Sequence, residues 1–200
     1  AGVLEKLFTK YPDHPGVAHY LIHSYDAPPI AAKGLDAARR YSKIAPDAPH
    51  ALHMPSHIFT RVGAWEDSVA VNRRSADVAK GDGNGNEAFH AADYMVYANL
   101  QLGRDQQARK VLDELNREVK TNPAIFVGPY AAAAIPARLA VERSDWAAAS
   151  QLPQQGGQFA FVEAITTFSR ALGAARKGDA AAAEQDAAKL EAQHKALVEA

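Results

Sequence analysis

Cysteine is absent from the 200-residue sequence, which excludes disulfide bonds and thiolate metal sites. This absence fits a cytoplasmic or a periplasmic protein equally, so it leaves the localisation open. An excess of one charge is also lacking, because 22 basic residues balance 23 acidic ones and neither kind is concentrated. We therefore expect neither nucleic acid nor an anionic membrane surface as the main partner.

Long apolar runs and strand patterns are missing as well. The sequence has no run of about 18 apolar residues, so we expect no membrane span. No segment shows the strict alternation of polar and apolar residues that is typical of a half-buried strand. Aromatic residues make up only 8% of the chain, alanine is frequent and β-branched residues are sparse. This composition predicts an all-α protein.

Turn signals recur along the chain at nearly regular intervals. Gly63, Gly103, Ser144 and Gly178 each stand in a short polar turn between two helical patterns, with spacings of 40, 41 and 34 residues. A period of this length with two helices in each repeat is typical of a helical-hairpin solenoid. The chain opens on the pattern of a second helix of such a pair, so we expect a fragment of a longer protein.

The residues around these turns resemble those of the tetratricopeptide repeat (TPR) family. Gly63, Trp65 and Ser68 match the glycine, aromatic and small positions of that repeat, and Pro46 and Pro123 stand where its closing proline does. The strings HPGVAHYLIH and HALHMPSHIF also resemble uncharacterised bacterial repeat proteins. The resemblance implies an α-α superhelix that forms one domain over residues 1–200, with approximate repeats 12–46, 47–85, 86–121, 122–157 and 158–200.

Seven of the eight histidines lie between residues 14 and 90. His19 and His23 are four residues apart, as are His53 and His57, so each pair shares one face of a helix. The TPR resemblance implies that this face lines a concave groove shared by neighbouring first helices. The residues that it would bring to the groove are His19, His23, His53, His57, Arg61, His90, Asp93, Tyr97 and Arg138.

The histidine pattern allows two functions and one purely structural interpretation. The favoured function is a non-enzymatic binding or scaffolding module that takes a peptide or a small ligand in the groove and needs no cofactor. The alternative is a metal-binding protein or a metal-dependent hydrolase that uses zinc or copper, since two imidazoles one turn apart can face one ion. Its ligands would come from His19, His23, His53, His57, His90 and Asp93. In the structural interpretation, the histidines bond backbone carbonyls near the helix breaks.

Four local features carry further expectations. His14 and His50 each neighbour a helix-start proline, so we expect both to cap helices. Residues 81–86 and 153–157 have the composition of loose segments, and Asn86 is expected to cap the helix that follows the first of them. Asn122 and Pro123 are expected to start the next helix. Pro55 and Pro136 each leave open whether their helix is kinked or broken.

Overall fold

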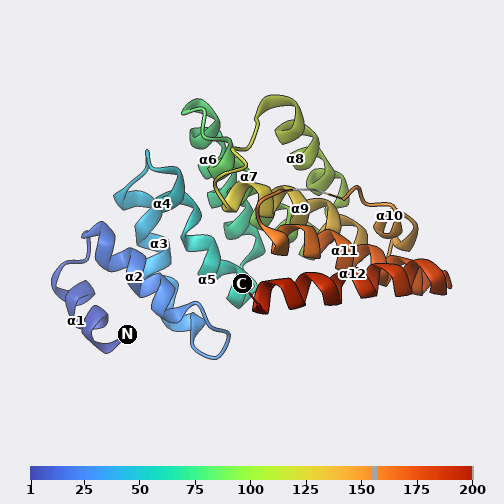
Figure 1. The fold of residues 1–200 in the computed structure, drawn as a ribbon. Helices are drawn as coiled ribbons and strands as arrows, with labels where there is room; N and C mark the ends of the chain where they lie inside the picture. The colour runs from blue at the N-terminus through green and yellow to red at the C-terminus, as the bar shows by residue number, and fades with distance from the viewer. Residues whose placement is uncertain (155–156, 200) are drawn as a thin grey trace. The chain divides into compact units, whose positions relative to one another are not determined.

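The computed structural model describes residues 1–154 and 157–199, and over these residues the regular secondary structure is all helical, with no strand (Figure 1). The all-α prediction is thereby confirmed. The helices form two compact units, Ala1–Lys120 and Thr121–Ala200. None of the helices in the described ranges combines the length and the apolar character that crossing a membrane requires.

The first unit contains the helices that carry the histidine pairs. In chain order they are α1 (Gly2–Lys10), α2 (Pro15–Tyr25), the 3-10 helix η1 (Ala31–Gly34), α3 (Leu35–Ile44), α4 (Pro49–His53), α5 (Pro55–Val62), α6 (Trp65–Gly81), α7 (Gly85–Gln101) and α8 (Asp105–Glu118).

Apolar side chains of α2, α3, α4 and α5 build one core in this unit. It includes Ile22, Tyr41, Met54 and Ile58, all of them buried. Burial of such side chains provides the main stabilisation of a helical hairpin, because short helices are marginal in isolation. The core fixes α2 against α3 and α5, while α4 and α5 also contact α6 and α7.

Pro55 breaks the helical segment that holds His53 and His57. Helix α4 ends at His53, Met54 has helical φ and ψ angles, and Pro55 is the first residue of α5. A proline is tolerated at this first position because the N–H that it lacks would have no partner within the helix. The two histidines therefore sit on two short helices rather than on one long one.

The four repeated turns adopt the conformation that their register predicts. Gly63, Gly103 and Gly178 have φ angles of 74°, 70° and 82°, and Ser144 has a φ angle of 54°. A positive φ angle ends a helix tightly and is easiest for glycine. The predicted turn positions are thus confirmed, including the one that has no glycine.

Two predicted helix starts are wrong. Asn84, not Asn86, caps α7 and accepts a hydrogen bond from the Glu87 backbone N–H at 3.2 Å. Gly83 has a φ angle of 67°, and this turn places Asn84 one residue before the helix. Asn122 accepts a hydrogen bond from the Ala124 N–H at 3.0 Å within a turn, and the next helix begins only at Val127.

The second unit comprises α9 (Val127–Val141), α10 (Trp146–Ser150), α11 (Ala160–Lys177) and α12 (Ala180–Val198). Pro136 lies inside α9, which continues through it as one helix. Phe126, Tyr130, Phe159 and Phe161 form a chain of ring contacts with centroid separations of 5.2–6.0 Å. Of the segment 153–157 that was expected to be loose, Gln155 and Gly156 lie outside the described residues.

Candidate functional site

Six histidines of the first unit form one continuous cluster. They come from α2 (His19 and His23), α4 (His50 and His53), α5 (His57) and α7 (His90). Each ring has a centroid within 6.5 Å of at least one other ring of the set. The structure therefore brings together the five histidines that were expected to line one groove, and it adds His50.

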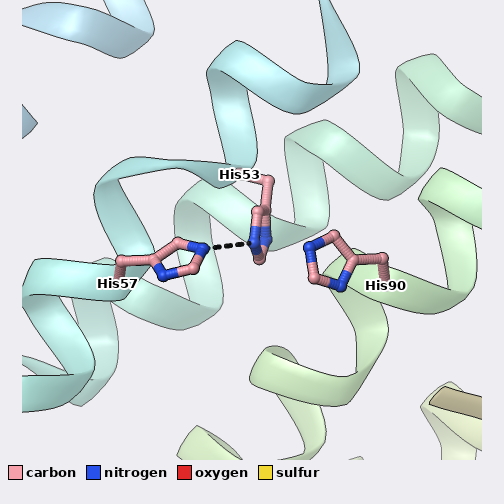
Figure 2. A group of neighbouring side chains, drawn as sticks. All are labelled: His53, His57 and His90. Carbon is pink, nitrogen blue, oxygen red and sulfur yellow. Dashed lines mark hydrogen bonds between the residues drawn. The ribbon is translucent and has the colours of Figure 1, made fainter. Parts of the chain in front are cut away.

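His53 is buried and His57 and His90 are partly buried; we call these three histidines the inner group. One ring nitrogen from each lies within 4.8 Å of the other two. In the part of the chain that the structure describes, this is the group of three potential metal-ligating side chains whose ligand atoms lie this close together. Figure 2 shows the ring of His53 between the other two, with all three side chains pointing toward one another. The Nε2 atoms of His53 and His57 lie 3.2 Å apart, and the ring centroids of His53 and His90 lie 4.2 Å apart.

A carboxylate fixes the orientation of the His57 ring. The Nδ1 atom of His57 lies 2.9 Å from Asp26 Oδ2, and the other oxygen of Asp26 accepts a hydrogen bond from Arg61 Nε at 2.8 Å. Burial raises the pKa of Asp26, but the hydrogen bonds from Arg61 and His57 outweigh this effect and hold it below its usual range. An ionised carboxylate only accepts hydrogen bonds, so Nδ1 of His57 carries the proton.

An amide fixes the orientation of the His53 ring in the same way. Asn72 donates from Nδ2 to the Ser68 backbone carbonyl at 2.8 Å, which identifies the atom that faces His53 as Oδ1. This oxygen lies 2.7 Å from His53 Nδ1 and can only accept. Nδ1 of His53 therefore also carries the proton.

These two hydrogen bonds leave a conflict at the other ring nitrogens. A neutral imidazole carries one proton, so Nε2 is a bare acceptor in both His53 and His57. The two Nε2 atoms nevertheless lie only 3.2 Å apart, so two bare acceptors are brought close together. A proton on one ring or a cation bound between the two nitrogens would relieve this repulsion.

Burial disfavours an additional proton on either ring. It lowers the pKa of His53 well below the usual value, and the nearby rings of His90 and His57 lower it further. Burial lowers the pKa of His57 as well, although Asp26 opposes this effect. The pKa of His90 falls to about 4, again because of burial. The inner group thus consists of three imidazoles that are neutral near pH 7.

The remaining histidines lie on the exposed side of the cluster. His23 and His19 approach to 2.9 Å between their Nε2 atoms, and His19 Nδ1 lies 3.1 Å from the Tyr41 hydroxyl. His50 does not cap α4 as expected, because Ala48 occupies that position and His50 lies within the helix. His14 does cap its helix, accepting a hydrogen bond from the Val17 N–H.

Other residues expected in the groove have different surroundings. Tyr97 packs edge-on against Trp65, with 5.7 Å between ring centroids. Asp93 is buried on α7 but does not belong to the inner group. Arg61 contributes through its ion pair with Asp26. Arg138 belongs to α9 in the second unit, so the histidine cluster forms without it.

Sequence reasoning missed Asp26, Asn72, Tyr94 and the role of His50. Tyr94 packs edge-on against His53, at 4.8 Å between centroids, and lies four residues after His90 on the same helix face. That spacing could have identified it. Asp26 and Asn72 come from other helices, and their positions follow no pattern shared with the histidines.

Comparison with known proteins gives no match, either among protein-family models or among curated proteins and solved structures.

Proposed function

We propose that the protein binds one divalent transition-metal ion, zinc or copper, through His53, His57 and His90. The supporting observation is the pair of bare Nε2 atoms of His53 and His57, which face each other at 3.2 Å while both Nδ1 atoms are held by acceptors. A bound cation removes this repulsion and leaves the hydrogen bonds at both Nδ1 atoms in place. Neutral imidazole nitrogen suits both zinc and copper.

The distance between the two nitrogens fits such an ion. Zinc–nitrogen bonds of about 2.0–2.1 Å in a tetrahedral arrangement separate two ligand atoms by about 3.3 Å. The observed separation of the two Nε2 atoms is 3.2 Å. The His90 nitrogen lies within 4.8 Å of both, so a small side-chain rotation would complete a three-histidine set. Asp26 and Asn72 would hold the ligand rings in the tautomer that binds metal.

Metal analysis of protein produced without a histidine tag tests this proposal. We expect close to one equivalent of zinc or copper, its loss on treatment with a chelator, and a rise in Tm when the ion is returned. An ion at 100 times its Kd stabilises the folded state by about 2.7 kcal/mol. Chelator-treated protein that takes up neither ion and keeps an unchanged Tm would refute the metal centre.

Two variants separate loss of a ligand from loss of the fold. His57→Gln removes an inner ligand at a partly exposed position and should abolish stoichiometric binding while the helical content is unchanged. His194→Gln alters the exposed histidine of α12, in the second unit, and should bind metal like the natural chain. Equal metal content in the two variants would contradict the assignment of His57.

Metal-dependent hydrolysis is a second candidate, favoured by the number of ligands. Structural zinc sites use four protein ligands, whereas catalytic sites use three and leave a position for water. The inner group offers three ligands. The test is zinc-dependent hydrolysis of an activated ester, compared between the natural chain and His57→Gln.

The binding groove and the TPR-like superhelix expected from the sequence remain proposals. In support of the repeat assignment, helix pairs are joined at Gly63, Gly103 and Gly178 by turns with positive φ angles. A peptide or small ligand bound without metal would favour the groove function. Isothermal titration of chelator-treated protein with a peptide library, compared with the same titration of metal-loaded protein, distinguishes it from the metal centre.

A further inference from the structure

Within the inner group His53 is fully buried while His57 and His90 are partly exposed, so an ion reaches the deepest ligand past other rings of the cluster. His53 has no exposed surface, whereas His23 is exposed and the side chain of His50 is 47% exposed. His50 lies against both inner and outer rings, with centroid separations of 5.3 Å to His19, 6.2 Å to His53 and 6.5 Å to His90. A continuous series of imidazoles therefore runs from solvent to the buried nitrogens.

The outer pair, His19 and His23, differs chemically from the inner pair. The Tyr41 hydroxyl can donate to Nδ1 of His19, and this leaves a proton on His19 Nε2 for a hydrogen bond to His23 Nε2. The outer pair thus has a fully satisfied state without any ion. Two imidazoles one turn apart can still bind a metal ion when one arrives, but two ligands hold it less firmly than three.

A carboxylate stands beside the connecting ring. Glu87 Oε2 lies 3.6 Å from His50 Nδ1, and this buried oxygen accepts no hydrogen bond from the residues that the structure describes. The close contact with the His50 imidazole lowers the pKa of Glu87, so this partly buried carboxylate is ionised at neutral pH. Such a charge attracts a cation toward His50 and the inner rings.

We propose that His19 and His23 form an outer metal site that captures the ion from solvent, and that His50 and Glu87 connect this site to the inner group. The proposal rests on the metal centre proposed above. It assigns a transfer role to the outer histidines rather than a share of the final coordination.

The kinetics of zinc binding test this assignment. A transfer site changes the rates of binding and release by the same factor, because the bound and free end states are the same. In stopped-flow mixing with a fluorescent zinc indicator, the double variant His23→Ala/His50→Ala should bind and release zinc about tenfold more slowly, because it loses the local accumulation of ions. Its Kd should equal that of the natural chain, and His194→Ala should change neither rate.

Each other outcome overturns the proposal. Unchanged rates in the double variant would show that the ion reaches the inner group without the outer site. A weaker Kd with faster release would show that His23 or His50 is a ligand in the final complex. No zinc uptake by the natural chain would remove the metal centre itself. Circular dichroism of the double variant checks that the helices are retained, which is expected because both side chains are substantially exposed.

Discussion

Asp26 links His57 of the inner group to the partly exposed side chain of Arg61. Its two oxygens contact His57 Nδ1 and Arg61 Nε, so one carboxylate sets both the tautomer and the orientation of a proposed ligand. Removing the negative charge makes His57 a weaker base and frees its ring to rotate. Loss of a group that supports a ligand in this way typically costs 10–100-fold in metal affinity, so we expect about that loss for Asp26→Asn.

Competition with a chelator of known affinity measures the effect of Asp26→Asn. The matched control is Asp36→Asn, because Asp36 also pairs with an arginine, Arg40, at a helix surface. Exposed pairs of this kind contribute little, about 0–1 kcal/mol, and Asp36 contacts no histidine of the cluster. Equal zinc affinity of the two variants would show that Asp26 does not support the site.

Acid should destabilise the metal-free protein through the inner histidines. The pKa of His90 is about 4 in the folded protein, against 6.5 as its ordinary value, because burial disfavours the charged ring. The unfolded chain therefore binds the proton first as the pH falls, and the folded state loses stability between pH 6.5 and about 4. This shift of the His90 pKa alone corresponds to roughly 3 kcal/mol, and the lowered pKa of His53 acts in the same direction.

Urea denaturation at pH 7.5 and pH 5, with a chelator present, measures this loss. The variant His90→Gln should lose less stability between the two pH values than the natural chain, because glutamine does not titrate. A free energy of unfolding that is equal at both pH values in the natural chain would contradict burial of neutral imidazoles.

The sequence predicted that the two histidines of each pair lie close together but not how their protons are arranged. The spacing of His53 and His57 is a local property and is readable from the helix period. Their tautomers depend on Asn72 and Asp26, which lie 19 and 31 residues away along the chain. Only packing of distant helices brings such partners together. The prediction for His50 failed because proximity to Pro49 says nothing about where its ring points.

At the scale of helices, the start of α7 controls where His90 lies. Gly85, the first residue of α7, packs against the backbone of Lys120, the last residue of the first unit. A Cβ atom added at Gly85 would lie 2.1 Å from the Lys120 carbonyl oxygen. Backbone cannot yield as a flexible side chain does, so Gly85→Ala must displace α7 or residue 120. We expect a loss of about 1–3 kcal/mol in the free energy of unfolding, as for other overpacked sites, and a weaker zinc affinity through His90.

Gly81→Ala provides the matched control four residues earlier. Gly81 ends α6, and an added Cβ there would meet no heavy atom within 4 Å. Alanine is favoured over glycine in a helix by up to about 1 kcal/mol, so this variant should be neutral or slightly more stable. Thermal and urea denaturation of both variants measure the difference. Equal stabilities would mean that the contact between Gly85 and Lys120 is not maintained in solution.

Helix boundaries were predicted well where one residue decides them and poorly where neighbours compete. Gly63 and Gly103 stand alone in their turns, and both end helices as expected. The run GDGNGN contains two asparagines that could each cap α7, and only the turn at Gly83 selects Asn84. Prolines also act differently with context, since Pro55 starts a helix and Pro136 lies within one.

For the whole molecule, the repeat pattern runs across the division between the two units. The turns at Gly103 and Ser144 keep the same register on either side of Lys120, so local turn signals could not have located a boundary there. The boundary depends on which helices contact one another. The sequence therefore predicted the order of helix pairs along the chain but not their grouping into Ala1–Lys120 and Thr121–Ala200.

This grouping predicts that the first unit alone carries the proposed metal site. The inner group, Asp26, Asn72 and the outer histidines all lie within Ala1–Lys120, which also has its own apolar core. A fragment that ends after Lys120 keeps the backbone carbonyl on which Gly85 packs. We expect this fragment to be helical by circular dichroism and to bind zinc with the affinity of the 200-residue chain. The fragment of residues 121–200 contains only His194 and should bind none. If the first fragment is folded but does not bind zinc, the site requires residues of the second unit, and the inner group is not sufficient.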